Sequence, residues 1–315
     1  MKQYLAIDIG GTAVKLGIVD EEGRVLSKTE QSVCFDNYET PILTTVLKAA
    51  KEFLAAQNIP AESLTGIGVS ATGQIDSRKG IVAGTCGSLP NYIGSPIKAE
   101  LEAMFGLPTT VANDANCMTL GEVWVGGAKG CTDVIGVTLG TGVGGGVIVN
   151  GKVIDGTHGA GGEIGHITVD RHETAACGCG KHGCLEQYSS ATGVVRCMKK
   201  LLDENPDADC VLRGKDFEAK DVFDAARSGD ALAAREVDKM TDTLGMALAS
   251  IASTTDPEMF LIGGGVSRAG DVLFDPLVEH FKTYAFKSCR ETPIKAASLG
   301  NDAGIYGAVR LIVGE

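Results

Sequence analysis

The most distinctive residues in the sequence are three cysteines and a histidine near the middle of the chain. The cysteines fall within eight residues, are separated by glycines, and follow the histidine after ten others: His166, Cys177, Cys179 and Cys184. Three thiolates and one imidazole make a typical tetrahedral structural zinc site. In a reducing compartment thiolates favour zinc over a disulfide, and a redox pair would leave the third cysteine and the glycines without a role. The pattern therefore predicts bound Zn²⁺, although His172 and His182 are also near and spacing alone does not identify the histidine ligand.

Two glutamates flank this cysteine-rich segment. Glu163 stands three residues before His166, and Glu186 stands two residues after Cys184. Hydrogen bonds to a charged carboxylate are stronger than those between neutral groups. A pair of carboxylates beside a pocket suits the neighbouring hydroxyls of a sugar. The segment therefore predicts a sugar-binding surface next to the metal, and not only a loop held by zinc.

Two turns rich in glycine and threonine are candidates for phosphate binding. One is Gly10–Thr12, just after Asp8, and the other is Gly140–Gly142. Glycines let backbone N–H groups approach a phosphate, and a threonine hydroxyl adds a donor. Asp8 is placed to hold a hydrated Mg²⁺ against the phosphates. A third glycine run, Gly263–Gly265, follows another predicted strand. The G-x-x-x-x-G-K-[ST] motif of a P-loop does not occur.

A neighbouring pair, Asn113 and Asp114, lies where a predicted strand meets a predicted helix. Asp114 is a candidate for the N-cap of that helix, which would be a purely structural role. Ligands of α/β folds, however, bind at the carboxyl ends of strands. A carboxylate there can orient a substrate hydroxyl and accept its proton during phosphoryl transfer. We interpret Asp114 as this base and Asn113 as a partner for a hydroxyl.

Strands and helices alternate along the chain, which is typical of an α/β fold. Apolar periodicity predicts strands early and late in each half and helices between them. The expected strands are Tyr4–Ile9, Val14–Asp20, Val25–Gln31, Gly66–Val69, Thr109–Ala112, Glu258–Ile262 and Ile294–Ser298. The expected helices are Glu39–Gln57, Ile97–Phe105, Ala115–Val125, 191–203, 219–228, 231–253, Val272–Ala285 and Gly304–Val313. Residues 4–26 and 133–156 share one order of strand, glycine-threonine turn, strand, glycine turn and strand, which predicts two related halves.

Composition narrows the classes of partner. A formal net charge of −12 over 315 residues argues against nucleic acid or an anionic membrane, because both favour a basic surface. No apolar run approaches the roughly 18 residues of a membrane helix, and the first residues lack the apolar core of a signal peptide. The ten cysteines are scattered, which favours a reducing compartment over a disulfide framework. We expect a cytoplasmic protein that acts on small molecules.

Together these motifs resemble the ROK family of repressors, open-reading-frame kinases and sugar kinases. The resemblance runs from Tyr4 to Val309 in the family's order. It rests on Asp8-Ile9-Gly10-Gly11-Thr12, Asn113-Asp114, Leu139-Gly140-Thr141-Gly142, Glu163-Ile164-Gly165-His166, the Cys177/Cys179/Cys184 group with Glu186, and Ile262-Gly263-Gly264-Gly265.

The resemblance implies a two-lobed actin-like fold, a duplicated ribonuclease H-like ATPase fold with a zinc-binding insertion. Sugar and ATP would bind between the lobes. The small lobe would be residues 1–116 with about 302–315, and the large lobe 117–301 with the zinc segment at 166–184. Family members are often dimers, so a homodimer is expected.

The family's functional residues carry over to matching positions here. Asp114 resembles the catalytic base. His166 would bind zinc through one ring nitrogen and sugar through the other. The implied sugar ligands are Asn113, Glu163, His166 and Glu186. The implied ligands of ATP and Mg²⁺ are Asp8, Gly10, Gly11, Thr12, Lys15, Thr141, Gly142, Gly263 and Gly264.

One loop departs from the glucose-directed pattern. Where such members often carry Asn-Leu-x-x-Trp, this chain has Ser88-Leu89-Pro90-Asn91-Tyr92. We count Ser88 among the sugar contacts, and a changed hydroxyl contact can reverse sugar preference. We expect an ATP-dependent kinase for the 6-hydroxyl of glucose, with N-acetylmannosamine, N-acetylglucosamine, mannose or a β-glucoside as alternatives.

Two other functions compete with a sugar kinase. A non-catalytic sugar-responsive repressor would carry a helix-turn-helix before the first strand, and only seven residues precede Asp8. An actin-like ATPase or acetate-type kinase would leave the two glutamates beside the metal segment, Glu163 and Glu186, unexplained. The kinase is therefore the prediction.

Overall fold

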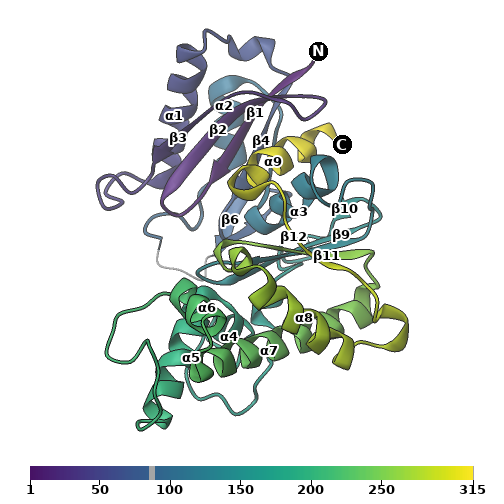
Figure 1. Cartoon of the computed structure of the whole chain (residues 1–315). Coiled ribbons are helices and arrows are strands. Elements are labelled where there is room, and N and C mark those ends of the chain that lie inside the picture. Colours follow the sequence, from purple (N-terminus) through teal and green to yellow (C-terminus); the bar gives the residue numbers. More distant parts are fainter. Residues whose placement is uncertain (85–88, 315) are drawn as a thin grey trace. The chain divides into compact units, whose positions relative to one another are not determined.

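The computed structural model describes residues 1–84 and 89–314 as an α/β protein (Figure 1). The chain divides into two compact units. The first contains Met1–Thr132, Gly146–Gly162 and Ser298–Glu315, and the second contains Asp133–Gly145 and Glu163–Ala297. In the described part of the chain, no helix has the length and apolar character needed to span a bilayer.

The first unit is built on a five-stranded mixed sheet. Its strand order is β3 (Val25–Ser32), β2 (Ala13–Asp20), β1 (Gln3–Ile9), β4 (Gly66–Ala71) and β7 (Thr109–Asn113). The first three strands are antiparallel neighbours. Strands β1, β4 and β7 run parallel. The carboxyl ends of these parallel strands therefore meet at one edge of the sheet, where Asp8, Ser70 and Asn113 stand.

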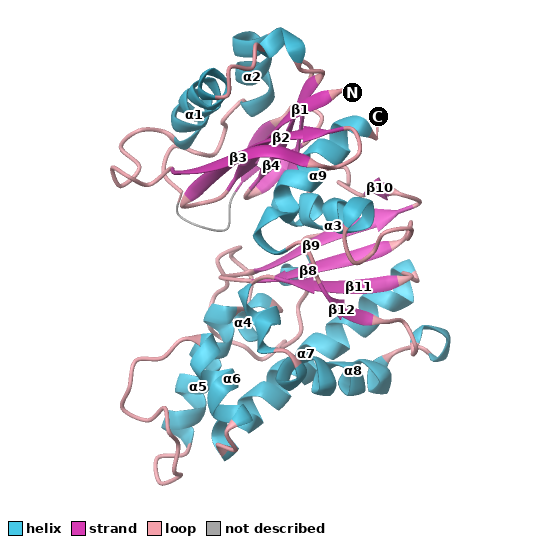
Figure 2. Cartoon of the chain, turned by 45° about the horizontal axis from the view of Figure 1, so that its top comes forward, coloured by secondary structure: helices cyan, strands magenta, loops and turns pink. Residues whose placement is uncertain are grey.

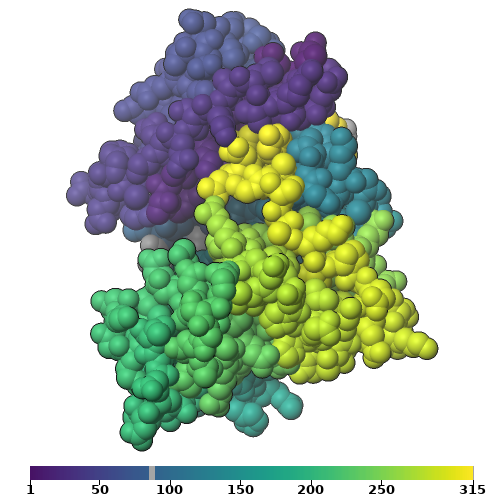
Figure 3. Space-filling view, in the orientation of Figure 1, coloured from purple at the N-terminus to yellow at the C-terminus, as the bar shows by residue number. Residues whose placement is uncertain are grey.

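Both faces of this sheet are buried, which explains the continuous apolar run of β1. Leu5 and Ile7 face the cluster that includes α1 (Ile42–Ala56) and α2 (Ile97–Phe105). Tyr4 and Ala6 face α9 (Ala303–Val313) on the other side. This alternation follows from the two-residue period of a strand. Figure 3 shows α9, in yellow, against the purple N-terminal segment.

A buried carboxylate fastens α3 (Asp114–Val125) to the returning C-terminal segment. Glu122 is fully buried and accepts four hydrogen bonds. Its donors are the Ser298 N–H at 2.6 Å, the Ser298 hydroxyl at 2.8 Å, and the N–H groups of Leu299 and Gly127 at 2.7 Å each. A buried charge needs such partners, because an unpaired one is costly. This network holds α3 in place.

The second sheet repeats the order of the first. It runs β10 (Lys152–Val153), β9 (Val143–Val149), β8 (Val134–Leu139), β11 (Met259–Gly263) and β12 (Ile294–Ala296), and the division between the units falls within β9. Strands β8, β11 and β12 are parallel. In chain order, both sheets therefore place the third, second, first, fourth and fifth strands side by side (Figure 2). This confirms the repeated topology predicted from residues 4–26 and 133–156.

The second unit also contains a group of α-helices. They are α4 (Glu186–Ser189), α5 (Ala191–Glu204), α6 (Ala219–Arg227), α7 (Ala231–Thr255) and α8 (Asp271–Tyr284). The long helix α7 begins at an Asp230 cap, whose carboxylate accepts from the N–H groups of Leu232 and Ala233, as helix N-termini require. Phe281 of α8 meets Phe260 of β11 edge to face, with ring centroids 5.6 Å apart. This helical layer therefore packs on the parallel strands.

The predicted strands and helices are present, with ends shifted by at most three residues. Sequence periodicity missed the short hairpin β5 (Gln74–Asp76) and β6 (Ile81–Gly84), and the single-turn helix α4. Elements this short carry too few residues for a recognisable period. Short 3₁₀ turns occupy Ala61–Ser63, Ile164–His166, Gly265–Ala269, Lys287–Cys289 and Gly300–Asp302.

Candidate active site

The first glycine-threonine turn joins β1 to β2. The Gly10 N–H donates to the Ala13 carbonyl at 2.9 Å, which closes the turn. The turn is held from outside, because the Tyr38 hydroxyl donates to the Gly11 carbonyl at 2.8 Å and the Val33 N–H to the Thr12 carbonyl at 2.9 Å. Thr12 itself is exposed. The turn is thus a fixed backbone feature with a free face.

Asp8 lies at the end of β1, next to this turn. Its carboxylate accepts a hydrogen bond of 2.7 Å from the Ser70 hydroxyl of β4 and lies 3.5 Å from the Lys15 ammonium. Lys15 also donates to the Asn301 carbonyl at 2.7 Å. Burial raises the pKa of Asp8 above its ordinary value, although Ser70 and Lys15 oppose the rise. Lys15 therefore lies beside Asp8.

Asn113 and Asp114 lie at the start of α3. Asn113 is the N-cap of α3, and its side-chain oxygen accepts from the N–H groups of Ala115 and Asn116 at 2.9 and 3.4 Å. Its amide also donates to the Gly73 carbonyl at 2.9 Å. Asp114 follows as the first residue of the helix, and its carboxylate also accepts from the Ala115 N–H at 2.9 Å.

The electrostatic setting of Asp114 suits a proton acceptor. Burial, together with the nearby charge of Asp8, raises the pKa of Asp114 to about 6. Hydrogen bonds from Ala115, Thr72 and Asn113 oppose this rise. A carboxylate with a raised pKa is a stronger base than an exposed one and is still ionised near neutral pH. Perturbed carboxyl groups of this kind are enriched at catalytic sites.

The second glycine-threonine turn joins β8 to β9. The Gly140 N–H donates to the Gly142 carbonyl at 3.0 Å. The start of α5 holds this turn, because the Thr192 hydroxyl donates to the Thr141 carbonyl at 2.6 Å. A β-carbon on Gly142 would stand 2.8 Å from a carboxylate oxygen of Glu186. The turn therefore lies directly against Glu186, whose side chain would have to shift to admit a β-carbon.

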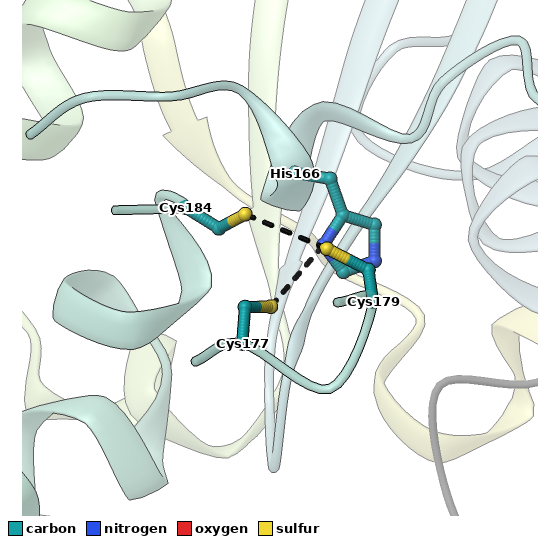
Figure 4. Close-up of side chains that lie close together, drawn as sticks. All are labelled: His166, Cys177, Cys179 and Cys184. Carbon is teal, nitrogen blue, oxygen red and sulfur yellow. Dashed lines mark hydrogen bonds between the residues drawn. The ribbon is translucent and has the colours of Figure 1, made fainter. Parts of the chain in front are cut away.

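His166, Cys177, Cys179 and Cys184 come together in the second unit (Figure 4). Their ligand atoms all lie within 4.8 Å of one another. The Cys177 sulfur is 3.7 Å from His166 Nδ1, and the Cys179 and Cys184 sulfurs are 3.6 Å apart. A tetrahedral zinc with bonds of about 2.3 Å places its ligand atoms roughly 3.8 Å apart. The donors and their spacing therefore fit one zinc ion.

His166 also lies between the two glutamates predicted to bind sugar. Its Nε2 is 3.8 Å from a Glu163 oxygen, and its Nδ1 is 3.8 Å from a Glu186 oxygen. The Cys177 thiol donates to Glu186 at 3.0 Å. Burial raises the pKa of Glu163. Nδ1 thus faces the sulfurs while Nε2 faces Glu163, and among the described residues His172 and His182 stand outside this group of ligand atoms.

A cavity that the sequence did not predict adjoins the second turn. It has a volume of about 710 Å³, and its lining includes Thr141, Phe217, Phe223, Gly265 and Val266. Its size and mainly apolar wall are typical of small-molecule sites. No periodic motif marks Phe217 and Phe223, which come from a loop and a helix that fold over the turn.

The remaining predicted residues have mixed outcomes. Gly263 ends β11, and Gly264 packs on β8, where a β-carbon would stand 2.4 Å from the Leu139 carbonyl oxygen. The cavity lining contains the next residue, Gly265. Gly264 therefore has a clear packing role. Ser88 lies outside the described residues.

Comparison with known proteins places the chain in a family. The ROK family model matches residues 4–315. A glucokinase of Halalkalibacterium halodurans is 38% identical, with 98% of this chain and 94% of the relative covered. The solved ROK family glucokinase of Streptomyces griseus, in complex with glucose and AMPPNP, is 34% identical, covers 98% of both chains and superposes with a TM-score of 0.78. An N-acetyl-D-glucosamine kinase of Vibrio cholerae is 28% identical over 98% of this chain and 99% of its own. This chain belongs to the ROK family.

Proposed function

We propose that this ROK protein is an ATP-dependent hexose kinase that transfers the γ-phosphate to the 6-hydroxyl of glucose. The observation that carries the proposal is Asp114, a carboxyl group with a pKa of about 6 at the carboxyl end of a parallel strand. Similarity to glucokinases at 38% and 34% identity supports the reaction and the sugar.

Asp114 acts as orienter and base in this mechanism. Its carboxylate accepts the proton of the sugar hydroxyl, whose oxygen forms a bond to the γ-phosphorus. The bond from that phosphorus to the bridging oxygen breaks, and ADP leaves. Because the transition state is loose, positioning and charge stabilisation contribute more than proton removal.

The first turn and Asp8 are assigned to the phosphates. Backbone N–H groups of Gly10 and Gly11 and the hydroxyl of exposed Thr12 can donate to phosphate oxygens. Asp8, held by Ser70 and Lys15, would hold hydrated Mg²⁺. When bound, Mg²⁺ would neutralise charge on the transferred group.

Sugar recognition is assigned to Glu163, His166 and Glu186, with Asn113 as a further partner. The two carboxylates accept hydroxyl protons, and their separation by the His166 ring suits neighbouring hydroxyls. Ser88 stays a prediction for the same role.

Zinc would be structural in this proposal. His166 Nδ1 and the three cysteine sulfurs would hold it, which leaves Nε2 directed to Glu163 and available to a hydroxyl. Bound zinc would fix the orientation of the imidazole ring. No step of phosphoryl transfer requires it.

The nucleoside half of ATP is assigned to the second unit. The turn at Thr141 and Gly142 would contact phosphate, and the adjoining cavity with Phe217, Phe223 and Val266 would take the base. Gly263 and Gly264 would border it by keeping β11 close to β8. We also propose the actin-like two-lobed fold with a zinc-binding insertion, and a homodimer as the working assembly.

Alternatives of two kinds, another acceptor sugar and a function other than catalysis, are compared with this proposal. N-acetylglucosamine is supported as acceptor by the Vibrio cholerae relative. N-acetylmannosamine, mannose and β-glucosides stay predictions for the same reaction. A non-catalytic regulator is the alternative of another class, and ATP turnover separates it from a kinase.

The test is ADP release from ATP and Mg²⁺ with each candidate sugar in turn. Glucose should give the highest kcat/KM, with glucose 6-phosphate as product by phosphorus NMR. Highest kcat/KM with N-acetylglucosamine would replace the proposed sugar but keep the reaction. No turnover with any of these sugars would overturn the kinase assignment.

A further inference from the structure

A second cavity in the second unit contains a buried carboxyl group without a partner. The cavity has a volume of about 630 Å³ and lies among α5, α7, α8 and residues 170–174. Glu236 of α7 lines it and is 3% exposed. Within the described part of the chain, its side chain makes no hydrogen bond or ion pair. Burying a carboxyl group without a hydrogen-bond partner is costly. A bound ligand would supply that partner.

Unpaired cations stand beside Glu236 on the same helix. Arg235 and Lys239 are exposed, lie four residues apart and line the same cavity. In the described residues neither side chain forms an ion pair or a hydrogen bond with a carboxylate, although the charge of Lys239 acts on Glu236. Like charges at this spacing repel each other on a helix. Lys200 of α5 adds a third cation and is paired only loosely, 3.9 Å from Glu204.

The other acidic groups at the cavity are already engaged. Asp238 and Asp242 lie 2.9 and 3.3 Å from the two ring nitrogens of His280. Glu173 lies 2.9 Å from the Arg196 guanidinium and accepts from the Tyr188 hydroxyl at 2.9 Å. The free groups are therefore one buried carboxyl and a set of cations.

We propose that this cavity is a second ligand site that binds a phosphorylated sugar. Sugar hydroxyls pair with Glu236, and the phosphate pairs with Arg235, Lys239 and Lys200. The volume lies within the range of about 300–1,000 Å³ that holds small molecules.

The state of Glu236 favours hydroxyls over an amine. Burial raises the pKa of Glu236 to about 8, although Lys239 and Arg196 oppose the rise. The carboxyl group is then mostly neutral at pH 7 and can both donate to and accept from a hydroxyl. An ammonium group would need the ionised form.

The wall of this cavity connects to the proposed sugar ligands. Arg196 and Tyr188 hold Glu173, and the Tyr188 hydroxyl also donates to Asp170 at 2.8 Å. These acidic residues belong to the segment between His166 and Cys177. A ligand that contacts Arg196 would therefore alter the segment between His166 and Cys177, which joins two of the zinc ligands.

This connection suggests feedback by product. A hexose 6-phosphate is the product of the proposed reaction, so occupancy of the cavity would change sugar affinity as product accumulates. This step rests on the proposed function, whereas binding to the cavity does not.

The test is calorimetric titration of the full chain with glucose 6-phosphate. Saturating glucose and a non-hydrolysable ATP analogue are present, so that product cannot bind at the active site. Saturable binding of one equivalent is expected. The double variant Arg235→Ala, Lys239→Ala should bind at least about tenfold more weakly, because charge-assisted contacts are lost. Lys282→Ala removes a half-buried cation of α8 outside the cavity and should bind like the parent protein.

Glu236→Leu tests the other end of the ligand. It should lose at least about tenfold in affinity, and it should fold, because the carboxyl group it removes makes no internal hydrogen bond. Inorganic phosphate alone should bind more weakly than glucose 6-phosphate in the parent protein and equally in Glu236→Leu.

Two results would overturn the inference. One is the absence of saturable binding with the active site filled, and the other is unchanged affinity in the Arg235/Lys239 variant. Failure here with normal sugar turnover removes only the second site. Absence of turnover with intact binding removes only the kinase assignment and the feedback step.

Discussion

The two sheets share a strand order but differ in chemistry at the same position. In the first, Asp8 of β1 pairs in register with Ser70 of β4, and the Ser70 hydroxyl donates to the carboxylate. In the second, Thr138 of β8 pairs with Gly263 of β11. The repeated sheet thus supplies two similar turns, while only one carries a carboxylate. The repeated sheet provides the framework, and single residues at the strand ends give the two turns different chemistry.

The second unit instead carries its candidate ligands in one segment of the chain. Residues 163–186 bring the His166 and cysteine group against the turn at Gly142. We therefore assign proton transfer to the first unit. Recognition of the sugar and of the nucleobase of ATP is assigned to the second unit. This division can be tested one unit at a time.

The largest expected effect is at Asp114. Asp114→Asn should lower kcat by about 10³-fold, since general-base groups contribute roughly 10²–10⁴. Stability should be unchanged or higher, because the variant removes a partly buried charge. Steady-state ADP release and thermal unfolding measure the two effects. Asp203→Asn, an exposed residue of α5, serves as control. Activity within tenfold of the parent would place the base elsewhere.

The next effect concerns stability of the first unit. Glu122→Ala removes the acceptor of four hydrogen bonds, three of which tie α3 to Ser298 and Leu299. The free energy of unfolding should fall by about 3 kcal/mol, measured by urea denaturation. Glu100→Ala, on the exposed face of α2, should change it little. A loss below about 1 kcal/mol would mean that the C-terminal segment is held by packing alone.

Loss of the metal should weaken sugar binding by the second unit. Cys184→Ser should lose the one zinc per chain expected of the parent protein, measured by elemental analysis. The sugar KM should rise by about 10–100-fold, because His166 loses its fixed orientation. Cys210→Ser, outside the cluster, is the control. A zinc-free variant with an unchanged sugar KM would separate the metal from sugar binding.

The pH dependence of kcat/KM should show a smaller, graded effect, which arises from the first unit. The base must be ionised, and the pKa of Asp114 is about 6. We expect kcat/KM to be half-maximal near pH 6, to level off about one unit above it, and to approach a tenfold fall per pH unit about one unit below it. The sugar dependence of ADP release between pH 5 and 8 measures this. A profile still level at pH 5 would exclude a base with a raised pKa.

Much of this arrangement could be predicted from sequence because it is local. The turns at Gly10 and Gly140, the cysteine group and the Asn113-Asp114 pair each occupy a few consecutive residues. The repeat also follows from local order. The division of lobes at 116/117 and near 302 stays a prediction. The first compact unit of the structure includes Thr132, Gly146–Gly162 and Ser298.

The parts that escaped prediction depend on distant residues. Periodicity cannot show that Glu122 meets Ser298, or that Phe217 and Thr141 line one cavity, because these pairs are brought together by the fold. Asn113 was expected to contact only a hydroxyl, yet it caps α3. Local propensity allowed either residue of that pair to cap, and backbone geometry selects Asn113.

The smallest expected effect tests whether nucleoside binding belongs to the second unit. Phe217 is half-buried and lines the cavity beside Thr141. Phe217→Ala removes part of an apolar wall, so the KM for ATP should rise about fivefold to tenfold. Because the nucleobase of ATP is remote from the transferred phosphate, kcat and the sugar KM should stay near the parent values. Phe286→Ala, exposed and outside the cavity, is the control. A raised sugar KM with an unchanged KM for ATP would assign the cavity to sugar and reverse the roles given to the second turn.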